Sequence, residues 1–190
     1  MNVFDSLQAI VWSGAYILMI VYSAKNMRLR KPTMPPVAGL ICFAWELNAI
    51  LISGGLWIHV VWLALDSAIF LLNVFNFRSL RGKACYCVAA IGALALFYFL
   101  FRVPSIDIML YSSFLLDLFI SVSFVVRIKH LLPNGRVWIS LLRLVGDFFA
   151  FLAYSEFTIV QFFGPVILIL NLFYLSMCFS MGSVKNAKHR

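Results

Sequence analysis

The sequence has 190 residues, of which 64% are hydrophobic and only 12% are charged. A soluble domain is about half apolar and about a quarter charged, and a chain of this size cannot bury so much apolar surface in its own core. The net charge of +8 does not indicate a nucleic-acid partner, because the basic residues lie between apolar runs rather than in one patch. The composition also excludes a disordered chain and a disulfide-rich secreted module, and it predicts an all-α integral membrane protein.

Seven apolar runs of roughly 18–24 residues follow one another, and each is long enough to cross a hydrocarbon core about 30 Å thick as a helix. The expected transmembrane helices cover residues 7–24, 34–55, 56–75, 84–101, 108–127, 136–154 and 157–180. The second and third helices should form a tight antiparallel pair around the Gly54-Gly55 turn. Because only short loops remain, residues 1–190 are expected to form one transmembrane domain surrounded by lipid.

The distribution of basic residues predicts the orientation. Of the 15 Lys and Arg residues, 13 fall on alternate loops and therefore on one side of the membrane, whereas the opposite side has Arg102. The positive-inside rule then places the N-terminus outside or in the lumen and the C-terminus in the cytoplasm, which requires an odd number of spans. The first run has no preceding basic residue and no cleavage site after it, so we expect a helix rather than a signal peptide. The expected location is a bacterial inner membrane or the endoplasmic reticulum.

Several ionisable side chains fall inside the expected helices, where a charge costs several kcal/mol unless it is paired or used. Arg143 and Asp147 are four residues apart on one helix and are predicted to form a structural ion pair there. Asp117, in the middle of the fifth helix, fits a packing role and a functional role equally well. Glu46 and Asp66 are different, because neither has a Lys or Arg within helical reach.

The face of the third helix that carries Asp66 is polar along its length. His59, Trp62 and Asp66 follow the spacing i, i+3, i+7 and therefore share this face. A carboxyl buried without a cation favours its protonated form, and a protonated carboxyl in a dry site is what general acid catalysis needs. Purely structural carboxyls remain the alternative. Trp45, next to Glu46, and Trp62 can stabilise a cation through their indole faces or can simply pack the bundle.

The remaining tryptophans and the metal-binding residue types suggest ordinary roles. Trp12, Trp57 and Trp138 are interpreted as interfacial residues, because Trp is enriched at membrane surfaces. The four cysteines form neither a disulfide framework nor a zinc motif, and the three histidines lie far apart in the sequence. No metal or cofactor is therefore expected, and the absence of lysine from the expected helices argues against a retinal protein.

The stretch from about residue 17 to 75 carries a resemblance to a known family. After a basic loop, Met34-Pro35-Pro36 opens the second helix, which contains Phe43-Ala44-Trp45-Glu46, and the third helix contains Trp62-Leu63-Ala64-Leu65-Asp66. With the chain length and the near-absent loops, this pattern resembles the small seven-helix integral-membrane terpene cyclases of fungal meroterpenoid and indole-diterpene biosynthesis and their short bacterial relatives.

The resemblance implies an enzyme that protonates an epoxide or alkene of a hydrophobic prenylated substrate and guides carbocation cyclisation without a metal. It assigns the general acid to Glu46. It also implies a second acid in the last helix, in an apolar-Asp-apolar-apolar-Tyr setting, but Asn171 stands at that place here, with Tyr174 at the expected distance. Either Asp66, Asp117 or Asp147 takes this part, or the initiation chemistry differs.

Two sets of site residues follow from these observations. The catalytic pair is predicted to be Glu46 and Asp66. The predicted substrate contacts are Trp45, His59, Trp62, Asp117, Arg143, Asp147, Asn171 and Tyr174. Two alternatives remain open: a proton-coupled small-molecule transporter whose intramembrane carboxyls act as a relay, and a structural subunit whose buried polar groups only specify helix pairing.

Overall fold

All regular elements in the described part of the chain are helices, as expected from the sequence. The computed structural model describes residues 3–53, 57–100, 102, 106–131 and 135–187. Short 3-10 turns, η1 (Met27–Leu29) and η2 (Ile128–His130), follow the first and fifth α-helices. The α-helices are α1 (Val3–Lys25), α2 (Pro36–Ser53), α3 (Trp57–Asn76), α4 (Leu80–Leu100), α5 (Ile106–Arg127), α6 (Arg136–Ala153) and α7 (Thr158–Ala187). The predicted Gly54-Gly55 turn lies outside the described residues.

The helices differ in how well they match a membrane span. Within the described residues, five helical segments are long and apolar enough to cross a membrane: α1, α3, α4, Ile108–His130 and Thr158–Met181. The apolar part of α2, Pro36–Leu51, is shorter. The buried residues of α6 include Arg136, Arg143 and Asp147. Helix α6 thus places ionisable side chains inside the bundle.

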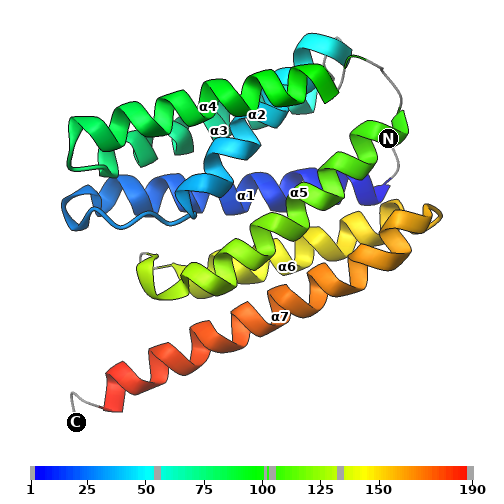
Figure 1. Cartoon of the computed structure of the whole chain (residues 1–190). Helices are drawn as coiled ribbons and strands as arrows, with labels where there is room; N and C mark the ends of the chain where they lie inside the picture. The colour runs from blue at the N-terminus through cyan, green and yellow to red at the C-terminus, as the bar shows by residue number, and fades with distance from the viewer. Residues whose placement is uncertain (1–2, 54–56, 101, 103–105, 132–134, 188–190) are drawn as a thin grey trace.

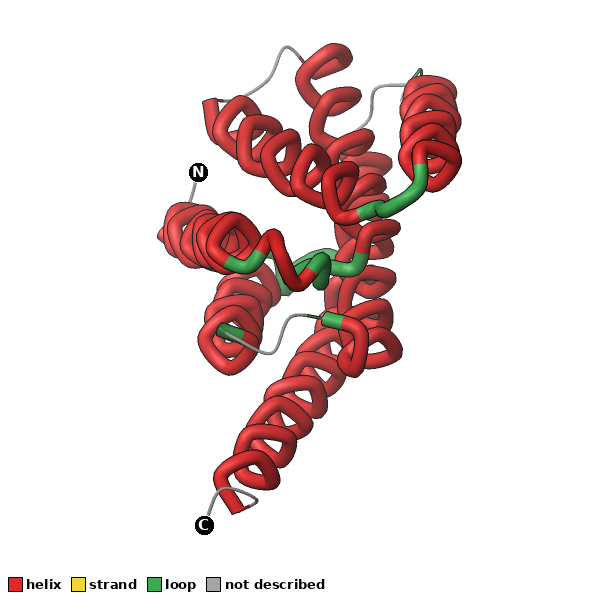
Figure 2. Tube along the Cα trace, turned by 90° about the vertical axis from the view of Figure 1, so that its left-hand side faces the viewer, coloured by secondary structure: helices red, strands yellow, loops and turns green. Residues whose placement is uncertain are grey.

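Of the seven α-helices in the described residues, six form a ring. Going around it, each of α2, α3, α1, α6, α7 and α5 packs against the next, and α5 returns to α2 (Figures 1 and 2). Helix α4 packs on α2 from outside the ring, next to α3. Most of its side chains are exposed, and its buried residues are Tyr86 and Ala90. The interior of the ring is therefore built without α4.

The connection from α1 to α2 is fixed by hydrogen bonds, and it sets the position of α2. The Thr33 hydroxyl donates to the Met19 carbonyl at 2.9 Å and lies 2.8 Å from the Ser23 hydroxyl. Helix α2 begins at Pro36, a residue favoured in the first helical position because its missing N–H would be unpaired there anyway. The Tyr86 hydroxyl of α4 donates to the Pro36 carbonyl at 2.7 Å. These contacts hold the helix that carries Glu46.

Helices α1 and α6 approach each other closely at Gly146. A Cβ atom at this position would lie 2.6 Å from Cδ1 of Trp12, so the indole would have to move. We expect Gly146→Ala to lower the free energy of unfolding by about 1–3 kcal/mol through overpacking. Gly92→Ala on α4 is the matched control, because a Cβ there has no neighbour within 4 Å. Thermal unfolding in detergent measures both variants, and equal stability of the two would contradict this packing.

Candidate functional site

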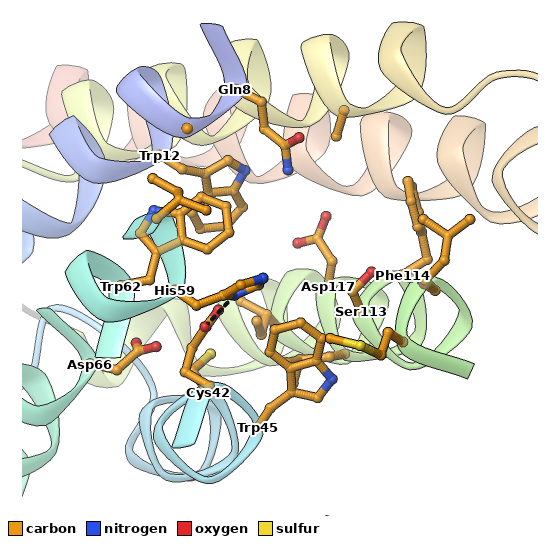
Figure 3. A pocket seen from close by; sticks show the side chains of 18 of the residues that line it. Gln8, Trp12, Cys42, Trp45, His59, Trp62, Asp66, Ser113, Phe114 and Asp117 are labelled. Atoms are coloured by element: carbon orange, nitrogen blue, oxygen red, sulfur yellow. Dashed lines mark hydrogen bonds and ion pairs between the residues drawn. The ribbon is translucent and has the colours of Figure 1, made fainter. Parts of the chain in front are cut away.

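A cavity of about 590 Å³ lies inside the ring, at the size typical of small-molecule sites. Helices α1, α2, α3, α5 and α6 contribute its walls (Figure 3). It reaches from the middle of the bundle, at Asp66 and Asp117, to the end where α1 and α3 begin and α6 ends, at Asp5, Ile58 and Tyr154. The loops rich in Lys and Arg lie at the other end of these helices. The cavity thus occupies the half of the bundle away from the basic loops.

Glu46 and His59 form a hydrogen-bonded pair on the cavity wall. Nδ1 of His59 lies 2.9 Å from Oε2 of Glu46, and the dashed line in Figure 3 marks this contact between α3 and α2. Glu46 is only 6% exposed. A carboxyl held by an imidazole in this way has a fixed orientation and a partner that can return a proton to it. Helical spacing predicted that His59 shares a face with Asp66, but it did not predict the direct bond from His59 to Glu46.

Asp66 lies deeper in the same cavity and has a different environment. It is 1% exposed, and its Oδ1 atom has no hydrogen-bond partner among the described residues. Its neighbours include the Tyr16 hydroxyl of α1, which also contacts the Cys42 thiol of α2. The predicted shared face of α3 is confirmed, since His59, Trp62 and Asp66 all line the cavity.

Indole groups surround the Glu46–His59 pair. The Trp45 indole donates to the Ser112 hydroxyl at 3.0 Å, and the Trp62 indole donates to the Ser13 hydroxyl at 3.2 Å. The His59 ring centroid lies 5.9 Å from that of Trp45 and 6.1 Å from that of Trp62. Both indoles therefore have fixed orientations next to the acidic pair.

The interpretation of Trp12 as an interfacial residue is wrong. Trp12 is 8% exposed and lines the cavity, whereas Trp57 and Trp138 are 64% and 61% exposed. Trp12 is drawn inward because the small Gly146 on α6 leaves space for its ring, and its face lies 5.4 Å from the Arg143 guanidinium carbon. An interfacial assignment from composition alone cannot detect such a contact.

Arg143 pairs with a different carboxyl from the one predicted. Its Nη2 atom lies 3.7 Å from Oδ1 of Asp117 on α5 and donates to the Ser121 hydroxyl at 3.0 Å. The Phe124 ring centroid is 4.2 Å from the guanidinium carbon, a cation–π distance. The predicted ion pair between Arg143 and Asp147 on α6 is therefore wrong within the described contacts. The side chain of Arg143 turns across to α5 instead of running along its own helix.

Asp147 interacts with the last helix. It accepts a hydrogen bond from the side-chain amide of Asn171 on α7. Tyr174, one turn further along α7, is 1% exposed and packs edge-on against Phe124. The place where the resembled family has an acid is thus occupied by an amide that contacts an acid from α6.

The predicted site residues separate into two groups. One group lines the cavity: Trp45, Glu46, His59, Trp62, Asp66 and Asp117. The other group is not among the described lining residues and forms a buried polar cluster behind Asp117: Arg143, Asp147, Asn171 and Tyr174. Asp117 is the residue that belongs to both groups.

Several lining residues were missed by sequence reasoning, chiefly on α1. Four residues of α1 line the cavity: Asp5, Gln8, Trp12 and Tyr16. Their spacing is i, i+3, i+7, i+11, so they share one helical face. This polar and aromatic stripe was the signal that could have found them. Ser113 lies one turn before Asp117 and was expected on the same helical face, whereas Tyr154 carries no distinguishing pattern in the sequence.

Within the described residues, no group of three or more His, Cys, Asp or Glu side chains could hold a metal ion. The chain matches no family model, no curated protein and no solved structure. The chemistry of the site must therefore be inferred from its own residues.

Proposed function

We propose that the chain is a membrane-embedded cyclase of prenylated substrates, with Glu46 as the general acid. The observation that carries the proposal is the Glu46–His59 pair at 2.9 Å inside a cavity lined by three indoles. Protonation of an epoxide or alkene produces a carbocation, which needs an acid, exclusion of water and aromatic faces beside the developing charge. The cavity offers the acid and the aromatic faces from side chains that the fold already orients.

The proposed reaction conserves all atoms of the substrate. Glu46 delivers its proton to the terminal epoxide oxygen or alkene carbon, and the internal double bonds then close rings by attacking the cationic carbon in turn. Loss of a proton from carbon ends the sequence, and the product is a cyclic isomer of the substrate. Asp66 or Asp117 accepts that proton, since both carboxyls line the same cavity.

A direct test uses purified protein in detergent, because a cyclase needs no gradient across a membrane. Incubated with a panel of prenylated phenols and their terminal epoxides, the protein should yield cyclic isomers of unchanged mass. The rate should persist in EDTA. In deuterated water, alkene protonation leaves one deuterium on carbon, whereas epoxide protonation leaves none there at that step. No isomer across the panel would contradict the proposal.

A proton-coupled transporter is the second candidate. It is favoured by the succession of ionisable side chains from the Glu46–His59 pair on the cavity wall to Asp117, Arg143 and Asp147 behind it. Intramembrane carboxyls in such a succession are typical of proton relays. Flux that exists only in sealed vesicles and stops when the proton gradient collapses would support this candidate against the cyclase.

The proposed topology has seven spans, an N-terminus outside or in the lumen and a cytoplasmic C-terminus. It is tested by single cysteines at two exposed serines in a chain whose four cysteines are replaced by alanine. Ser79→Cys lies between α3 and α4, in a basic loop, and Ser155→Cys lies between α6 and α7. A membrane-impermeant maleimide should label Ser79→Cys only from the cytoplasmic side and Ser155→Cys only from the other. Labelling of both from one side would contradict this topology.

A further inference from the structure

The cavity has an uneven charge composition. Four of the described lining residues are acidic: Asp5, Glu46, Asp66 and Asp117. No described lining residue is Lys or Arg. Arg143, which pairs with Asp117, lies behind it and is 0% exposed. A ligand with an anionic head would therefore meet carboxyls and no lysine or arginine on the cavity wall.

Asp66 marks one place within the cavity where a positive group would be stabilised. Its carboxyl is 1% exposed, and Figure 3 shows it pointing toward the cavity from α3. Oδ1 has no hydrogen-bond partner among the described residues, and a buried polar atom of this kind is costly unless a ligand or water satisfies it. The Tyr16 hydroxyl contacts the Asp66 carboxyl, but its Oδ1 atom is available to a ligand.

Aromatic faces complete this environment. Trp62 lies one helical turn before Asp66 on the same face of α3, and Trp12 and Tyr16 line the adjacent wall from α1. Indole and phenol rings attract organic cations more strongly once water is excluded. The combination of buried carboxyl and aromatic rings is the one that recognises alkylammonium groups.

We propose that this cavity is a binding site for hydrophobic organic cations, namely ammonium ions on a prenyl-length apolar chain, with Asp66 as the counter-ion. The apolar chain lies against Ile120, Leu116 and the aromatic walls, and the ammonium group lies at the inner end. This preference for the charge of the ligand is independent of whether the protein performs the proposed cyclisation.

The experiment compares three ligands that share one chain and differ in head-group charge: farnesyldimethylamine, farnesol and farnesoic acid. The protein carries Trp57→Phe and Trp138→Phe, so that the remaining three of its five tryptophans all line the cavity and report binding by their emission. It is held in phosphatidylcholine nanodiscs at neutral pH, and protein-free nanodiscs correct for partitioning. We expect the dissociation constant of the amine to be at least about tenfold lower than that of the acid. Equal or tighter binding of the acid would overturn the proposal.

A substitution locates the counter-ion. Asp66→Asn should raise the dissociation constant of the amine about tenfold and change that of farnesol little, because the near-isosteric amide keeps the shape but cannot ionise beside the ammonium group. The control is Glu156→Gln, an exposed carboxyl outside the cavity, which should leave all three constants unchanged. An unchanged ratio of amine to farnesol binding in Asp66→Asn would remove Asp66 from this role. If Asp66→Asn does not fold, the three-ligand series on the parent decides the proposal.

The outcomes also separate this inference from the proposed reaction. A protein that prefers the amine but forms no cyclic isomer contradicts the cyclase and supports the cation site. A protein that forms isomers and binds the acid as tightly as the amine contradicts the cation site alone.

Discussion

Membranes carrying Glu46→Gln should contain as much folded protein as parent membranes and should convert a prenylated substrate at least about a hundredfold more slowly. The amide has nearly the shape of the carboxyl and can still hydrogen-bond to His59, which lies 2.9 Å away in the parent. It has no acidic proton to deliver. Product formation per folded protein, measured by mass spectrometry after chromatography, checks the expectation.

The chain offers a matched control, because it has only one other glutamate, Glu156. Glu156 is exposed and does not line the cavity, so Glu156→Gln should cyclise at the parent rate. His59→Gln should fall between the two variants, because it removes the group that orients Glu46 and can return a proton to it, but leaves the acid itself. Parent-like conversion by Glu46→Gln would remove the residue from the general acid role.

The second large effect is expected at Arg143, in stability rather than in chemistry. Arg143→Gln should lower the free energy of unfolding by about 3–5 kcal/mol, because it leaves the half-buried Asp117 without its cation. Asp117→Asn should cost a similar amount by leaving the guanidinium without its anion. The double variant should cost about 1–3 kcal/mol less than the sum of the two single changes. Unfolding in mixed micelles with increasing SDS measures all three proteins.

The same measurements distinguish the partner of Arg143. A double-mutant cycle should give a coupling energy of about 1–3 kcal/mol between Arg143 and Asp117, and a smaller one between Arg143 and Asp147. Arg28→Gln, at an exposed arginine of η1, should leave stability unchanged and serves as the control. A larger coupling to Asp147 would restore the pairing expected from the spacing on α6.

The helices could be predicted from the sequence because hydropathy is a local property. The bounds of α3 and α6 agree with the expected runs to within one residue at each end, at Trp57–Asn76 and Arg136–Ala153. Helix α7 continues to Ala187, beyond the expected end at residue 180, because no Pro or Gly-Pro signal stops it after the apolar run. How the helices surround a cavity, with α4 left outside, depends on contacts between distant segments and had no local signal.

The site was predictable where its residues share one helix or a neighbouring pair. The face of α3 with His59, Trp62 and Asp66 follows from helical spacing, and its position next to Glu46 follows from the expected close pairing of α2 with α3. The partner of Arg143 did not follow, because a long side chain can reach across to α5 as easily as along α6. Trp12 was misassigned for a related reason, since its burial depends on Gly146, which is distant in sequence.

The position of the cavity in the half of the bundle away from the basic loops has a consequence for lipid asymmetry. With the proposed orientation, the cavity end at Asp5 and Tyr154 lies at the level of the outer or lumenal leaflet. A prenylated amphiphile made in the cytoplasm enters the inner leaflet first, and it would have to flip across the bilayer before reaching this end. The steady rate in cells would then be set by transbilayer movement of the substrate, whereas detergent removes the two leaflets and with them this barrier. A flippase acting on the substrate would increase the rate in cells without changing the purified protein at all.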